Sequence, residues 1–310
     1  MKISLLIRVC MLIMTPFLTS ETFSQDSLFV SAEKELSTLL TEMRKTTSDS
    51  IRTELNNTFG AALYEQLCRT DAQNWSFDSL NIAKLVSEDG KVSIFNWNIQ
   101  QNDKSNLYSA IVCHWASGKI VQLETMQPLQ YISDEDVFTQ GKWPGGLFYN
   151  IIQRRDGPAD TYTLLSWDGY NPAASRKTIE ILTFDKDNMP VFGAPLFKTK
   201  NGIKNRVISA YASRAAFTQN YDKQTITLYN VRKSQRKIND KMIVLDRLVP
   251  MNESLEGQRW AYVPAGNIYD AYVFYEGFWT YVEDIAPRNP AAKGKKEKEK
   301  PVSYELFPPR

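Results

Sequence analysis

The chain has 310 residues, of which 43% are hydrophobic and 12% aromatic, and its 37 lysines and arginines nearly balance its 35 aspartates and glutamates. Proteins that bind nucleic acid through charge carry a surplus of basic residues, so this balance argues against nucleic acid as a partner. The length suffices to bury a sizeable core in one large domain or two small ones.

The first 24 residues have the pattern of a secretory signal peptide. Lys2 and Arg8 flank a short apolar run, and Thr22-Phe23-Ser24 supplies the small residues that a signal peptidase needs. The uncharged run over residues 9–18 is about half of the roughly 20 residues that cross a bilayer, which favours cleavage over a membrane span. We therefore predict an exported protein, periplasmic or secreted, without a transmembrane span in the mature chain.

Two amphipathic helices are predicted at the start of the mature chain. Apolar residues recur at helical spacing from Phe29 to Met43 and again from Ile51 to Leu67. The segment between them is rich in residues that cap helix N-termini. Because each helix has one apolar stripe, we expect residues 25–72 to form a helical hairpin that packs on the rest of the protein.

The rest of the chain has the periodicity of β-strands. From about Lys91 almost to Pro287 the hydrophobic period is 2, and short turns such as Ser117-Gly118 and Glu276-Gly277 predict antiparallel neighbours. About eleven short strands must curl or split into layers. We predict a mainly β fold with an antiparallel barrel-like or sandwich-like domain over residues 73–286. The predicted strands are 92–100, 107–115, 119–126, 147–154, 161–167, 178–184, 206–211, 225–231, 242–248, 269–275 and 278–282.

Residues 287–310 change character. Lysines alternate with glutamates between prolines, so this segment has too few apolar residues to order itself. We predict a flexible tail.

No motif indicates a metal or cofactor site. The one histidine, His114, excludes zinc sites built on several histidines, and neither a glycine-rich phosphate loop nor a G-x-S-x-G elbow is present. Asp185, Asp187 and Asn188 alternate as calcium ligands do, but Pro190 stands where a calcium loop requires glycine. We therefore predict no cofactor and no bound metal.

Two cysteines remain after cleavage. Cys68 and Cys113 could form one disulfide in an oxidising compartment, and the sequence leaves their pairing open.

Acidic residues in apolar segments leave an enzymatic alternative. Glycosidases hold two carboxylates some ångströms apart, with the proton affinity of one raised by burial. The candidates for such a pair are Asp168, Glu180, Asp246 and Asp270.

Aromatic side chains suggest a ligand-binding site. Flat rings stack on sugars and peptides, although aromatic residues also fill β-sheet cores. Trp143 begins a Trp-Pro-Gly-Gly turn that suits either an exposed stacking indole or a loop folded back onto the core. The predicted ligand-binding residues are Trp143, Trp167, Asp168, Tyr170 and Trp279, with Asp168 as a hydrogen-bond acceptor.

Five short motifs follow one another between Tyr162 and Tyr281. They are Leu165-Ser166-Trp167-Asp168-Gly169, Val191-Phe192-Gly193-Ala194-Pro195, Val244-Leu245-Asp246-Arg247-Leu248, Tyr269-Asp270-Ala271 and Gly277-Phe278-Trp279. Their order resembles an uncharacterised family of exported, β-rich Gram-negative bacterial proteins. The resemblance covers less than half the chain. It implies export and a β-rich domain, and it implies no activity, ligand or functional residue.

These observations favour a non-enzymatic binding or accessory protein of the bacterial envelope. Its expected partner is a glycan, a peptide or another envelope protein. The alternative is a carboxylate-based hydrolase that acts on polysaccharide or cell wall.

Overall fold

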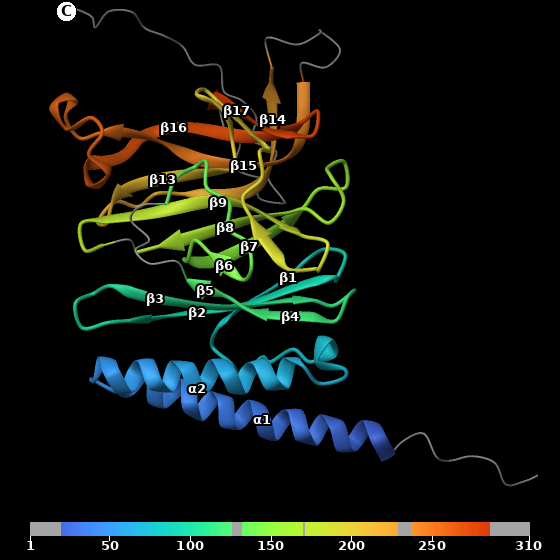
Figure 1. Ribbon diagram of the computed structural model, residues 1–310. Coiled ribbons are helices and arrows are strands. Elements are labelled where there is room, and N and C mark those ends of the chain that lie inside the picture. Colours follow the sequence, from blue (N-terminus) through green and yellow to red (C-terminus); the bar gives the residue numbers. More distant parts are fainter. Residues whose placement is uncertain (1–19, 126–131, 170, 229–236, 286–310) are drawn as a thin grey trace, which may run out of the picture.

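The computed structural model describes residues 20–125, 132–169, 171–228 and 237–285 (Figure 1). Most of the predicted signal peptide and the whole predicted tail at 287–310 lie outside these residues. The described elements stack as layers, with two helices on one side and three large β-sheets above them. The fold is mainly β, as predicted.

The helical layer consists of α1 (Ser20–Lys45) and α2 (Asp49–Leu67). Ser48 is the N-cap of α2, and its side chain accepts a hydrogen bond from the backbone N–H of Ile51, which satisfies one of the free donors at the helix start. Both helices turn their apolar stripes toward the first sheet, confirming the predicted helical hairpin. The buried residues of the stripes include Phe29, Leu36, Leu40, Met43, Phe59, Leu63 and Leu67.

The first sheet is an antiparallel meander in chain order. Its strands are β1 (Ala83–Val86), β2 (Val92–Gln100), β3 (Asn106–His114) and β4 (Lys119–Gln122). A two-stranded parallel sheet of β5 (Glu124–Thr125) and β6 (Lys142–Trp143) follows it.

The second sheet is built around the long strand β9, which pairs with β8 on one side and with both β10 and β13 on the other. As a result, β7 lies at one edge of this sheet and β13 at the opposite edge. The strands are β7 (Leu147–Gln153), β8 (Tyr162–Asp168), β9 (Ala174–Phe184), β10 (Pro190–Phe192) and β13 (Arg206–Ala212).

The third sheet has the order β12-β11-β17-β16-β15-β14, in which only β11 and β17 pair in parallel. Glu276 and Gly277 both have positive φ, at 50° and 81°, as the two-residue turn between β16 and β17 requires. The strands are β11 (Phe197–Thr199), β12 (Gly202–Lys204), β14 (Gln219–Thr227), β15 (Lys237–Pro250), β16 (Tyr262–Tyr275) and β17 (Phe278–Ile285). Within the described residues, three short 3₁₀ helices lie outside the sheets: η1 (Ala72–Asn74), η4 (Glu253–Leu255) and η5 (Arg259–Ala261).

Strands in the first two sheets are buried on both faces. In β2, Ile94 packs toward the second sheet while its neighbour Phe95 packs toward the helices. In β8, Leu164 packs toward the first sheet and Leu165 toward the third. Successive side chains of a strand point to opposite faces, so another layer must cover each face of these sheets. Stacked open sheets, a sandwich-like arrangement, meet this requirement.

The Asn96 side chain joins the first sheet to the edge of the second. It lies on β2 with 0% exposure, and its Oδ1 accepts from the Phe148 backbone N–H at 2.9 Å. Its Nδ2 donates to the Phe148 carbonyl at 3.3 Å. One amide therefore satisfies both backbone groups of a residue on edge strand β7.

The substitution Asn96→Ala should destabilise the protein by about 3 kcal/mol, because it leaves the buried N–H and C=O of Phe148 without partners. Urea unfolding followed by far-UV circular dichroism measures the effect. Asn220→Ala, at an exposed position on β14, is the matched control and should cost less than about 0.5 kcal/mol. Equal unfolding midpoints for the two variants would contradict this role of Asn96.

Candidate functional site

Asp168, the predicted hydrogen-bond acceptor for a ligand, is buried in an ion pair. Its Oδ2 accepts from Nε of Arg176 at 2.6 Å, and both side chains are buried. The next residue, Gly169, donates its backbone N–H to the Tyr108 hydroxyl at 2.9 Å. Burial raises the pKa of Tyr108, and the charge of Asp168 raises it further. This group of side chains therefore ties the first sheet to the second.

Glu180 forms a second buried ion pair, with Arg206 at 2.7 Å, and both residues are 0% exposed. Burial raises the pKa of Glu180 to about 7, against the opposing effect of the Arg206 charge. Arg206 also donates to the carbonyls of Ser133 and Asp136 at 2.8 Å. A carboxylate enclosed in this way has no access to a substrate.

Asp270 and Asp246 also have internal partners. Asp270 accepts from the Arg247 guanidinium, from the Tyr281 hydroxyl at 2.6 Å and from the backbone N–H of Asp284 at 3.0 Å. Burial alone would raise the pKa of Asp270, but these donors lower it. Asp246 accepts from a backbone N–H on the adjacent segment.

The partners of Glu180 and Asp270 are thus arginine, tyrosine and backbone groups. A glycosidase needs two neighbouring carboxylates that shift each other's pKa.

His114 and Cys113 do not form a nucleophilic pair. They are neighbours on β3, so their side chains lie on opposite faces of the first sheet. Nδ1 of His114 lies 2.7 Å from the Ser117 Oγ, its ring stacks on Phe184, and burial lowers its pKa. Burial raises the pKa of the Cys113 thiol, which keeps it protonated and unreactive. Cys113 and Cys68 are both free thiols in this structure.

The predicted aromatic site does not assemble on one surface. Trp143 is 0% exposed in the core between the first two sheets, where its Nε1 donates to Thr125 Oγ1 at 2.9 Å. Trp279 is 1% exposed in the core between the second and third sheets, and its Nε1 donates to Thr163 Oγ1 at 2.8 Å.

The expectation of an exposed indole at Trp143 is therefore corrected in favour of the folded-back loop. Neither Trp143 nor Trp279 presents a ring face to a ligand here. Trp167 is half-buried on β8, and Tyr170 lies outside the described residues.

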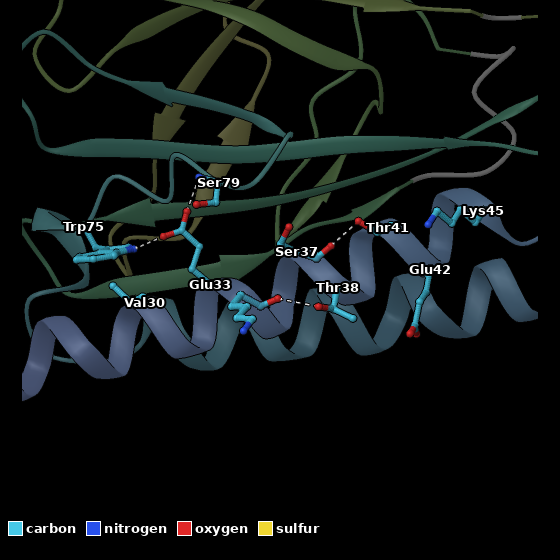
Figure 2. A pocket seen from close by; sticks show the side chains of 10 residues that line it. Val30, Glu33, Ser37, Thr38, Thr41, Glu42, Lys45, Trp75 and Ser79 are labelled. Carbon is cyan, nitrogen blue, oxygen red and sulfur yellow. Dashed lines mark hydrogen bonds between the residues drawn. The ribbon is translucent and has the colours of Figure 1, made fainter.

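An open trough of about 630 Å³ lies between α1 and the loop before β1. Figure 2 shows the side chains that line it. At its centre the buried Glu33 accepts from Nε1 of Trp75 at 2.9 Å and from the backbone N–H of Ser79. Along α1, the Thr38 and Thr41 hydroxyls donate to carbonyls of the same helix. The Glu33 carboxylate thus joins α1 to the loop, whereas the two threonine hydroxyls bond within α1.

A second cleft of about 630 Å³ follows the edge of β7. Arg154 crosses it and binds Asp156 at 2.8 Å and Asp240 at 2.7 Å. Arg154 thus bridges two carboxylates across the cleft, and Lys241, whose ammonium lies over the Tyr221 ring, also lines it.

A third hollow, which we name the β13 groove, differs from the other two. It has a volume of about 660 Å³ at the edge of the second sheet. No local sequence pattern indicates it, because its parts are far apart in the chain. It is formed by residues 132–134, by residues 208–210 of β13, and by Leu248, Gly257, Arg259 and Tyr262.

The β13 edge presents unpaired backbone groups to this groove. The N–H of Ser213 donates to the Ala173 carbonyl at 2.9 Å, which fixes the alternation of hydrogen-bonded pairs between β13 and β9. By this alternation, the N–H and C=O of Ile208 and Ala210 point away from β9. No described residue forms a hydrogen bond with these four groups.

Comparisons of the chain with protein-family models, with curated proteins and with solved structures found no match. None of the described helices combines the length and the apolar composition that a membrane crossing requires. Within the described residues, no three His, Cys, Asp or Glu side chains gather where they could hold a metal ion.

The substitution Asp270→Asn should cost about 2 kcal/mol of stability at pH 7, because it removes the charge that Arg247 and Tyr281 bind. In the folded protein the pKa of Asp270 is lowered, so its stabilising effect is present above the unfolded pKa of about 4 and is lost as pH falls below it. The stability difference between wild type and Asp270→Asn should therefore shrink below about pH 4.

Thermal unfolding from pH 3 to pH 8 measures this difference, with Asp187→Asn on the exposed β9–β10 turn as the control. A difference that stays constant across this range would show that the carboxylate is not held in its charged form.

Proposed function

We propose that this chain is an exported, non-enzymatic binding or accessory protein of the bacterial envelope, and that it binds its partner in the β13 groove. The observation that carries the proposal is the set of four unpaired backbone groups on Ile208 and Ala210. Unpaired edge groups are a template for pairing with another chain, and proteins commonly cover or interrupt such edges. Here they line an open groove.

The disposition of the carboxylates supports binding over catalysis. Asp168, Glu180 and Asp270 each bind an arginine, and all three are buried. A hydrolase needs a carboxylate that reaches its substrate in a cleft. The hydrolase alternative gains no support from these contacts, and neither does a stacking role for the buried Trp143 and Trp279.

The location in the envelope rests on the sequence pattern of the first 24 residues. A mature chain that starts near Gln25 keeps the buried stripe of α1 from Phe29 onward. Cleavage at the predicted site is thus compatible with the helical layer.

The proposal predicts that filling the groove weakens partner binding. Ala210→Tyr places a phenol ring in the groove, and Ala116→Tyr, in the exposed turn after β3, is the matched control. The tagged mature chain and both variants are incubated with solubilised envelopes, and each retained component is then titrated in purified form. We expect wild type and Ala116→Tyr to bind one component saturably, and Ala210→Tyr to bind it at least about tenfold more weakly.

Two results would overturn the proposal. The first is equal binding by Ala210→Tyr, with an unchanged melting temperature. The second is hydrolysis of peptidoglycan or polysaccharide by the purified wild type that Asp168→Asn or Glu180→Gln abolishes.

A further inference from the structure

We infer that the ligand of the β13 groove is an extended polypeptide segment that adds to β13 as a new strand and places an acidic side chain beside Arg259. This inference rests on the proposed function, because it names the chemistry of the partner at the same groove. Its parts are the free backbone groups of β13, the recessed position of this edge and the charge of the groove.

The backbone groups of Ile208 and Ala210 match an extended chain. Each residue presents one donor and one acceptor, and the two residues are separated by one position along β13. Residues two apart in a strand repeat at roughly 6.6 Å on the same edge. A partner strand offers its own N–H and C=O groups at this repeat, so it can satisfy all four groups at once.

The position of the edge favours a free peptide over a second copy of this chain. The groove lies between residues 132–134 on one side and the segment with Gly257, Arg259 and Tyr262 on the other. A second copy would bring the same flanking segments with its own β13, and the two sets would meet before the strands did. A segment without flanking structure can enter.

The charge of the groove selects an acidic segment. Asp134, the acidic residue that lines the groove, lies 3.5 Å from the Lys204 ammonium, which it shares with Glu135. Arg259 is exposed, and no described carboxylate forms an ion pair with it. The available charge is therefore a guanidinium, which binds carboxylates with two parallel hydrogen bonds.

Synthetic peptides test both parts of the inference on the wild-type protein. The probes are fluorescein-labelled peptides of about eight residues in which threonine and valine alternate, with either one glutamate or one lysine near the centre. Fluorescence anisotropy measures Kd. We expect the glutamate peptide to bind about tenfold more tightly than the lysine peptide. Two further peptides carry backbone N-methyl groups, one on the odd-numbered residues and the other on the even-numbered residues. One of them should lose binding and the other should bind nearly as well as the unmodified peptide, because only every second amide faces β13.

Two variants test the protein side. Ile208→Pro removes a donor from the open edge without removing a β13–β9 hydrogen bond, and proline is tolerated at such edge positions. It should weaken the binding of the glutamate peptide at least about fivefold. Arg259→Glu should reverse the preference in favour of the lysine peptide. Arg214→Glu, at an exposed position after β13, should change nothing.

Each remaining outcome is decisive. The inference is wrong if both N-methylated peptides lose binding equally, or if Arg259→Glu still prefers the glutamate peptide. Neither result depends on whether Ile208→Pro folds. If Ala210→Tyr weakens the binding of a purified envelope component but no peptide binds, the groove is a binding site and strand addition is wrong. If Ala210→Tyr also has no effect, the proposed function fails as well.

Discussion

The structure depends on one constraint, which is that strands with apolar side chains on both faces must be covered on both faces. Ile94 and Phe95 on β2, and Leu164 and Leu165 on β8, point into different cores. The first sheet therefore needs the helices on one side and the second sheet on the other, and the second sheet needs the third. Charged side chains enclosed between these layers require partners, because an unpaired buried charge costs several kcal/mol. The pairs of Asp168 with Arg176 and Glu180 with Arg206 meet that requirement.

The same constraint shapes the open edges of the sheets. Stacking covers the faces of the sheets, but the backbone N–H and C=O groups on the outer side of each edge strand need other partners. At β7 the Asn96 amide bonds both groups of Phe148. At β13 the flanking segments leave a groove, and the groups of Ile208 and Ala210 stay open within it. The β13 groove therefore brings open edge groups together with the exposed Arg259.

Sequence patterns predicted the elements that local periodicity determines. The helices follow from apolar stripes, and β2 has the predicted bounds of 92–100. The short strands β1, β6, β10, β11 and β12 were not predicted, because two to four residues carry no clear period. The strand predicted at 225–231 is β14 at Gln219–Thr227, since polar residues on its exposed face hide its start; the predicted end lies outside the described residues. Periodicity also cannot show that another layer covers a tryptophan, as at Trp143 and Trp279, or that three distant segments enclose a groove.

Amide hydrogen exchange of the chain without its predicted signal peptide, resolved by residue with NMR, tests this account most directly. Exchange reports the free energy of the opening that exposes each amide. The account predicts the slowest exchange in β2, β8 and β9, which are covered on both faces, and fast exchange at Ile208 and Ala210 between protected amides at Val207, Ser209 and Tyr211. Uniform protection along β13, or rapid exchange throughout β2 and β8, would contradict it.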